Sequence, residues 1–219
     1  MNATVVYVHG LWLNGWEGAW LCRRLSRQLK CAARRFAYSS ITAELNANAR
    51  SLGQFLAATP ADTLHLVGHS FGGLVILDFF ESVLSASGLL ENGLLLPPGR
   101  VVLLGSPVRG SRSARRLAQL PFGKRMMGMA LNALLPASGE RRWQGGRDLG
   151  IIAGDLSLGM GRLLGAIDAP NDGTVLIEET RLMGASEHVK LAVSHSGMVF
   201  SASVARQIAA FLRDGRFVS

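Results

Sequence analysis

Apolar and polar positions along the chain follow two alternating patterns. Short runs of consecutive apolar residues, typical of strands buried on both faces, alternate with longer stretches of helical periodicity. The predicted strands are Thr4–Val8, Arg35–Tyr38, Thr63–Val67, Arg100–Leu104, Leu149–Ala153 and His188–Val193, and the predicted helices are Glu17–Lys30, Glu44–Ala58, Phe71–Ser85 and Gly197–Arg213. Because strands that alternate with helices indicate βαβ units, we expect an α/β fold with a mostly parallel six-stranded sheet and helices on both faces.

One long region interrupts this alternation. No clear strand lies between Ser106 and Asp148. Within this region the segment Phe122–Leu135 has one apolar helical face, made of Phe122, Met126, Met129, Ala130, Ala133 and Leu134. A long insertion of this kind is commonly a lid or binding segment, but an amphipathic helix docked on the core gives the same pattern. We expect a helical cap or lid insertion at about 106–148, and the sequence leaves both roles open.

Length and composition favour one globular domain over residues 1–219. The chain is 48% hydrophobic and 17% charged, which suits a large core and argues against disorder. No leader-like segment precedes the first strand and no apolar run is long enough for a membrane span, so a cytoplasmic location is expected. Cys22 and Cys31 have no metal-ligand neighbours, which favours free thiols.

The net charge of +8 is concentrated in the segments Arg23–Arg35 and Arg109–Arg147. A basic surface can attract nucleic acid, anionic lipid or an anionic substrate. No nucleic acid is expected as a partner, because no basic groove interleaved with aromatic residues and no nucleic-acid-binding motif accompanies the charge. A solvated basic face is the commonest explanation, and contact with an anionic membrane surface is the main alternative.

The most specific motif is Gly68-His69-Ser70-Phe71-Gly72, which joins an apolar run to a helical pattern. A Gly-x-Ser-x-Gly motif between a strand and a helix is typical of a nucleophile elbow. The chain turns so sharply there that only very small residues fit two positions before and after the serine. The motif therefore predicts Ser70 as a nucleophile held above the edge of the sheet.

A serine nucleophile needs a histidine to accept its proton and an acid to orient that histidine. In chains with this elbow the three follow in the order serine, acid, histidine. Of the five histidines, only His195 lies both downstream of Ser70 and just after a predicted strand. Catalytic groups in open parallel sheets gather beyond the carboxyl ends of the strands, so we predict His195 as the base.

Asp172, in Asn171-Asp172-Gly173, is the best candidate for the acid. The same tripeptide is ordinary turn chemistry, however, and Asp155 is a rival because it directly follows the strand Leu149–Ala153. Asp168 is a weaker rival. The sequence leaves this choice open.

Two backbone N–H groups would stabilise the negative charge that develops on the substrate oxygen. One belongs to Phe71, which follows the nucleophile at the start of a helix. The other would come from the loop after the first strand, where His9-Gly10-Leu11 offers the Leu11 N–H. Trp12 in this loop, with Met126 and Met129 of the insertion, could line an apolar substrate pocket.

These residues together resemble the α/β-hydrolase superfamily, in particular its small bacterial lipases and esterases, including the PGAP1-like group. The resemblance runs from Val8-His9-Gly10 to Ser194-His195-Ser196-Gly197, and the loop at 105–111 is similar to the one leading into the cap of lipases. It implies the roles given above for Ser70, His195, Asp172, Leu11 and Phe71. It also implies the minimal six-strand version of the fold, with the strand Thr4–Val8 next to the elbow strand.

The expected function is therefore hydrolysis of a carboxylic ester through an acyl-enzyme, on a small-molecule or lipid acyl ester, with no cofactor and no metal. A thioesterase or acyltransferase would use the same three residues. A catalytically idle scaffold that binds lipid or a protein partner through the basic, methionine-rich insertion is the alternative from another class.

Overall fold

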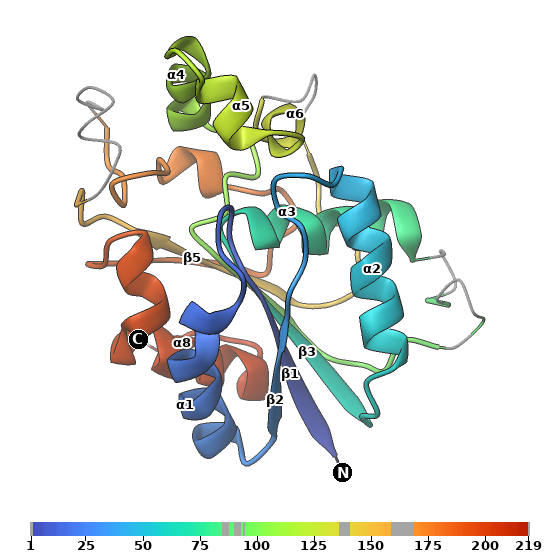
Figure 1. Cartoon of the computed structure of the whole chain (residues 1–219). Coiled ribbons are helices and arrows are strands. Elements are labelled where there is room, and N and C mark those ends of the chain that lie inside the picture. The colour runs from blue at the N-terminus through green and yellow to red at the C-terminus, as the bar shows by residue number, and fades with distance from the viewer. Residues whose placement is uncertain are drawn as a thin grey trace.

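The computed structural model describes residues 2–84, 88–89, 93, 95–135, 141–158 and 169–218. Its strands are β1 (Ala3–Val8), β2 (Ala32–Phe36), β3 (Thr63–His69), β4 (Val101–Leu104), β5 (Leu149–Gly154) and β6 (Glu187–Leu191). They form one parallel sheet in the order β2-β1-β3-β4-β5-β6 (Figure 1). This confirms the predicted six-stranded parallel sheet, including the pairing of β1 with the elbow strand β3.

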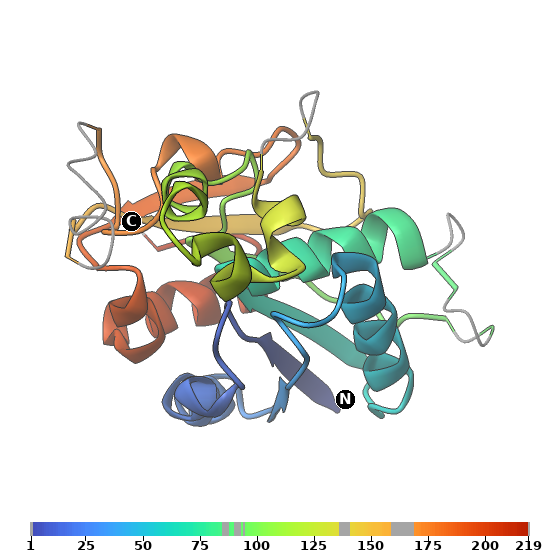
Figure 2. The same cartoon turned by 45° about the horizontal axis from the view of Figure 1, so that its top comes forward.

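Helices cover both faces of this sheet (Figures 1 and 2). On one face lie α1 (Ala19–Leu29) and α8 (Ala202–Asp214), and on the other lie α2 (Leu45–Ala57) and α3 (Phe71–Asp78). Successive strand residues alternate between the two cores, so that Val5 packs on the α1 and α8 side and Val6 on the α2 and α3 side. Because both faces are buried, the strands appear in the sequence as continuous apolar runs rather than alternating ones.

The central helix α3 is buried on all sides over Phe71–Leu77 and continues as a π-helical turn at Phe79–Val83. The predicted helix Phe71–Ser85 is therefore correct in position, although Ser85 lies outside the described residues. None of the helices in the described part of the chain combines the length and apolar character needed to cross a bilayer. Cys22 and Cys31 are free thiols.

Strand β2 begins and ends earlier than the predicted Arg35–Tyr38. It pairs only with β1, in the register Thr4 with Ala32 through Val8 with Phe36. On this edge strand only Phe36 is buried, so its first residues form no apolar run that the sequence pattern could reveal. Tyr38 leaves the strand and stacks on the His9 ring.

The C-terminal elements also differ in detail from the prediction. Strand β6 ends at Leu191 rather than Val193, whose N–H donates to the Leu191 carbonyl oxygen in a tight turn (2.8 Å). The predicted helix Gly197–Arg213 is divided into a 3-10 helix, Ser196–Phe200, and α8. The division lies at Ser201, whose hydroxyl accepts the Val204 N–H (3.3 Å) and caps α8.

The described residues of the insertion, 106–135 and 141–148, include the short helices α4 (Arg112–Gln119), α5 (Gly123–Met127) and α6 (Ala130–Leu134). The single helical face predicted over Phe122–Leu135 is wrong, because the chain turns between α5 and α6 at Gly128, which has a φ of 54°. A Cβ atom at Gly128 would lie 2.3 Å from the Ile41 carbonyl oxygen, so close backbone approach determines this break. In Figure 1 the three helices lie above the carboxyl ends of the strands.

Candidate active site

Ser70 lies at the sharp turn between β3 and α3 and has left-handed backbone angles, with φ 53° and ψ −120°. Side-chain-bearing residues rarely adopt this region, and those that do are commonly found at functional sites. The Ser70 N–H donates to the Leu104 carbonyl oxygen of the neighbouring strand (2.8 Å), which ties the turn to the sheet.

The two glycines of the motif make this turn possible. A Cβ atom at Gly72 would lie 2.2 Å from the Val8 carbonyl oxygen, and one at Gly68 would lie 2.8 Å from the Gly73 backbone. Real Cβ atoms do not approach backbone atoms this closely, so only glycine fits at either position. The spacing in the motif thus reflects the contact between the α3 N-terminus and the strands beside it.

His195 lies after β6 and pairs with Asp172 from the loop after β5. The Nδ1–H of His195 donates to Asp172 Oδ2 (2.7 Å), and the His195 backbone N–H donates to the Asp172 carbonyl oxygen (2.8 Å). Asp172 is 1% exposed and His195 8%. Because Nδ1 carries the hydrogen, Nε2 keeps its lone pair and is the ring atom able to accept a proton.

The Asp172 carboxylate is held from both sides. Its Oδ1 accepts the N–H groups of Thr174 (2.9 Å) and Val175 (2.7 Å). Two glycines at strand ends leave room for the pair, since a Cβ at Gly105 would lie 2.9 Å from Asp172 Oδ2 and one at Gly154 would lie 2.8 Å from Asp172 Cβ. Sequence reasoning missed Gly105 and Gly154, although both directly follow or end apolar strands.

The rival residues have other partners. Asp155 forms an ion pair with Lys190 (3.2 Å). His188 Nε2 lies 2.9 Å from Thr180 Oγ1. His188 lies within β6 rather than in the loop that follows the strand. Asp168 lies outside the described residues. The geometry therefore brings His195 together with Asp172 rather than with Asp155.

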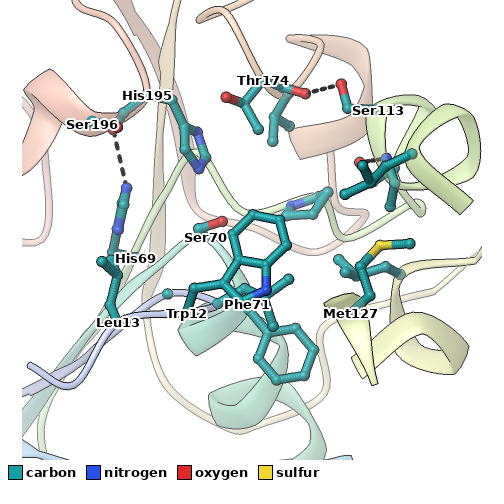
Figure 3. Close-up of a pocket in the computed structure, with 18 of the residues that line it drawn as sticks. Trp12, Leu13, His69, Ser70, Phe71, Ser113, Met127, Thr174, His195 and Ser196 are labelled. Carbon is teal, nitrogen blue, oxygen red and sulfur yellow. Dashed lines mark hydrogen bonds between the residues drawn. The ribbon is translucent and has the colours of Figure 1, made fainter. Parts of the chain in front are cut away.

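Ser70 and His195 line the same cavity, and the His195 ring is directed into it on the side of Ser70 (Figure 3). Within the described ranges the Ser70 hydroxyl has no hydrogen-bond partner. Catalytic hydrogen bonds are often long or poorly aligned before substrate binds.

The Leu11 and Phe71 residues also border this cavity. Phe71 is the first residue of α3, where N–H groups lack intrahelical acceptors. A Cβ at Gly10 would lie 3.2 Å from Ser70 Cβ, so the loop after β1 passes directly beside the elbow. His9 fixes this loop, because its Nδ1–H donates to the Gly10 carbonyl oxygen (2.8 Å) and its Nε2 accepts the Tyr38 N–H (3.2 Å).

The cavity has a volume of about 320 Å³ and is mainly apolar. Trp12, in the loop after β1, lines it. The structure brings Met127 to the cavity, whereas the side chains of Met126 and Met129 are exposed and border other space. The buried side of α5 is formed by Gly123 and Met127, one position away from the predicted Met126.

His69 is a further residue of this site to which the sequence assigned no role. It is fully buried, its Nε2–H donates to the His195 carbonyl oxygen (3.1 Å), and its ring lies 4.9 Å from the His195 ring. Burial, with the His195 ring beside it, lowers the pKa of His69 to about 3, so the ring is neutral at neutral pH. His69 therefore links the elbow strand to the loop that carries His195.

The site thus combines a hydroxyl at the cavity surface, an imidazole whose Nδ1 is bound to a buried carboxylate, and N–H groups at a helix start. This combination suits attack by an alcohol oxygen on a carbonyl carbon. Among the described residues, no group of three or more His, Cys, Asp or Glu side chains could hold a metal ion.

No protein-family model matches the sequence, and no curated protein matches it either. Solved structures match in fold. The mature form of the lipase BlEst2 of Bacillus licheniformis has a TM-score of 0.65 at 17% identity, over 96% of this chain and 90% of that one. An extracellular α/β-hydrolase of a Paenibacillus species has a TM-score of 0.58 at 14% identity, over 99% of this chain and 100% of that one.

The phospholipase PlaB of Legionella pneumophila has a TM-score of 0.63 at 17% identity, over 82% of this chain. The match spans only 44% of that protein. At these identities the likeness concerns the fold, and the chain has the α/β-hydrolase fold.

Proposed function

We propose that this protein is a serine hydrolase of carboxylic esters, with Ser70 as nucleophile, His195 as base and Asp172 as the residue that orients the base. One observation carries the proposal: Ser70, in a strained strand-to-helix turn, borders the same cavity as a histidine whose Nδ1 is bound to a buried aspartate. A strained backbone at a residue with a nucleophilic side chain favours function over packing.

The reaction follows from these positions. The Ser70 oxygen attacks the ester carbonyl carbon while its proton passes to His195 Nε2. The N–H groups of Leu11 and Phe71 stabilise the tetrahedral oxyanion. The alcohol leaves with the proton from His195, and an acyl-enzyme remains. Water then attacks the acyl carbon, gives its proton to His195, and the acid is released from Ser70.

The apolar cavity favours an ester with an apolar acyl group. Its 320 Å³ hold about ten groups of the size of a water molecule or a methylene. Each methylene that enters contributes about 0.8 kcal/mol to binding, so kcat/KM for p-nitrophenyl esters should rise steeply with acyl length and level off once the cavity is filled.

The similar solved structures support this choice of reaction. BlEst2 is a lipase and PlaB a phospholipase, so the same fold carries ester hydrolysis in both. The lipase and esterase type of the superfamily fits the apolar cavity. Membership of the PGAP1-like group stays a prediction from the sequence motifs.

Active-site labelling tests the proposal most directly. A fluorophosphonate probe should label the wild-type protein, and labelling should disappear in Ser70→Ala and His195→Ala. Asp172→Asn should lower ester turnover by about 10⁴-fold, by analogy with triads whose acid has been changed to an amide. Asp155→Asn and His188→Ala are the matched controls and should keep wild-type rates.

The same assays separate the alternatives. Turnover of acyl thioesters in preference to esters, or transfer to an added alcohol in preference to water, would indicate a thioesterase or an acyltransferase. A folded wild-type protein that the probe does not label would contradict the hydrolase and favour a binding scaffold.

A further inference from the structure

The insertion leaves large apolar side chains in solvent next to the cavity. Leu120, Phe122 and Met126 are 49%, 77% and 52% exposed, and Met129 is also exposed. Phe122 lies at the turn between α4 and α5 and has a left-handed φ of 63°. We call Leu120, Phe122, Met126 and Met129, with the exposed cations Arg115, Lys124 and Arg125, the insertion surface.

The insertion surface is separate from the residues that pack the insertion on the core. The insertion already buries a separate set of residues against the rest of the protein: Ala114, Leu117, Met127, Ala130 and Leu134. Two hydrogen bonds fix its position, one from the Met129 backbone N–H to the Ile41 carbonyl oxygen (2.8 Å) and one from the Trp12 indole Nε1–H to the Met126 carbonyl oxygen (2.8 Å). The docked helices thus hold Phe122 and Met126 outward.

The part of the insertion that carries α4, α5 and α6 has charges of one sign. From Ser106 to Leu135 the sequence has six Lys and Arg residues and no Asp or Glu. Lys124 and Arg125 form no ion pair in the part of the chain that the structure describes. A cationic surface with aromatic and aliphatic side chains between the charges matches the headgroup region of an anionic bilayer, where apolar groups enter the acyl boundary and cations face phosphates.

The surface also adjoins the opening of the cavity. Trp12 and Leu13 line the cavity and are themselves exposed, and the Trp12 indole is bonded to the backbone of α5. Figures 1 and 2 show α4, α5 and α6 on the same side of the sheet as the loop after β1. A flat partner that contacts the insertion surface would therefore lie across the entrance to the cavity.

We propose that the insertion surface docks onto the surface of an anionic lipid bilayer and turns the cavity entrance toward it. The docking itself is independent of the ester hydrolase function. Its consequence, that substrates reach the cavity from the membrane, rests on that proposed function.

Vesicle binding tests the docking. Ser70→Ala protein, which leaves lipids intact, is mixed with vesicles of phosphatidylcholine alone or with phosphatidylglycerol added, and bound protein is measured by co-sedimentation. We expect binding to the anionic vesicles and much weaker binding to the neutral ones, with loss of binding at high salt. In the same background, Lys124→Ser with Arg125→Ser should weaken binding by about 30-fold, since each cation near the surface contributes about fivefold.

Two control variants separate this face from overall properties of the protein. Arg23→Ser with Arg27→Ser removes the same charge from exposed positions on α1, which lies at the opposite end of the molecule (Figure 1), and should leave binding nearly unchanged. Phe122→Ser should weaken binding by about tenfold or more, whereas Leu95→Ser, at a position that is 67% exposed, should not.

Each of four results would overturn the proposal. Equal binding to neutral and anionic vesicles would remove the role of charge, and equal loss in the Arg23 and Lys124 double variants would remove the role of this face. Self-association that Phe122→Ser abolishes, without vesicle binding, would make a second copy of the chain the occupant. Failure to bind vesicles with normal hydrolysis of p-nitrophenyl esters refutes the docking alone, and binding without hydrolysis refutes the hydrolase alone.

Discussion

Ser70 and Gly128 have nearly the same backbone conformation in two regions that are built differently. Their φ and ψ angles are 53° and −120° for Ser70, and 54° and −135° for Gly128. The elbow uses a residue with a side chain in a conformation that favours glycine, whereas the insertion uses glycine itself. The comparison teaches that the turn at Ser70 carries backbone strain, whereas the turn at Gly128 has the same angles without that strain.

The surroundings differ accordingly. The Ser70 turn lies between buried strands and α3, and its remaining side borders the cavity. The turn at Gly128 contacts one loop, at Ile41, and lies between two helices of five residues each. Strain persists only where the surrounding structure over-determines it, so we expect the two regions to respond differently to substitution.

The largest effect should come from replacing Ser70 itself. Ser70→Ala and Ser70→Gly should both lower ester turnover by about 10⁴-fold or more, because the nucleophile is lost. Their stabilities should differ, since glycine relieves the strain and alanine does not. Ser70→Gly should unfold in urea with a free energy about 1 kcal/mol higher than Ser70→Ala, after the entropic cost of glycine. A less stable Ser70→Gly would mean that the turn is not strained.

A Cβ atom added in each region comes next. Gly72→Ala brings Cβ to 2.2 Å from the Val8 carbonyl oxygen inside the sheet and should lower the free energy of unfolding by about 3 kcal/mol or more. Gly128→Ala makes an equally close contact with Ile41, but α5 and α6 can move outward. We expect a loss of about 1–3 kcal/mol, confined to the insertion.

Hydrogen exchange distinguishes the two outcomes. Exchange should accelerate across β1 and β3 in Gly72→Ala and only over α4 to α6 in Gly128→Ala. Gly146→Ala is the control, because Gly146 also has a positive φ of 65° but no atom within 4 Å of its added Cβ. Uniform acceleration in Gly128→Ala would show that the insertion unfolds together with the sheet.

The contrast between the elbow and the turn at Gly128 also explains which parts of the fold could be predicted from the sequence. The sheet and the elbow were predictable because continuous apolar runs and the Gly-x-Ser-x-Gly spacing reflect local sterics. The break at Gly128 was not, because it depends on Ile41, which is distant in the sequence. The sequence also did not show that Met127 rather than Met126 lines the cavity, because both are apolar and adjacent on the predicted helix.

In the candidate site, too, the features that depend on tertiary contacts could not be predicted from the sequence. Asp172 and Asp155 could not be separated by sequence, since both lie after the same strand, and only the fold pairs Asp172 with His195. The bond from His69 to the His195 carbonyl oxygen was equally hidden, because the variable position of the elbow motif carries no signal of its tertiary partner. The choice of acid and the roles of these residues stay predictions for the assays above.

Acid should weaken the sheet region and spare the insertion, which has no histidine. Burial, with Arg100 and Arg147 nearby, lowers the pKa of His65 in β3 to about 4. Below pH 6.5 the unfolded chain binds a proton at His65 that the folded protein does not, so stability falls as the pH drops toward 4. His65 should account for about 2 kcal/mol of the decrease between pH 7 and pH 5.

Urea unfolding of the wild type and His65→Gln at both pH values measures this term. The variant should lose about 2 kcal/mol less than the wild type between pH 7 and pH 5. His188→Gln is the comparison, because half-burial also lowers the pKa of His188 and its removal should flatten the pH dependence less. An identical pH dependence in His65→Gln and the wild type would contradict the prediction.

The smallest effect concerns a hydrogen bond between the loop after β1, which passes beside the elbow, and α5 of the insertion. The Trp12 Nε1–H donates to the Met126 carbonyl oxygen (2.8 Å), and Trp12→Phe removes this donor while keeping an aromatic ring. A hydrogen bond at a partly exposed site contributes about 1 kcal/mol, so amide exchange in α5 should accelerate by about fivefold while β3 is unaffected. Trp143→Phe removes an equivalent bond, to the Arg147 carbonyl oxygen (2.7 Å), and should leave α5 unchanged. If Trp12→Phe leaves the exchange of α5 at the wild-type rate, the packing of Met127, Ala130 and Leu134 and the bond from the Met129 N–H to the Ile41 carbonyl oxygen suffice to hold the insertion on the core.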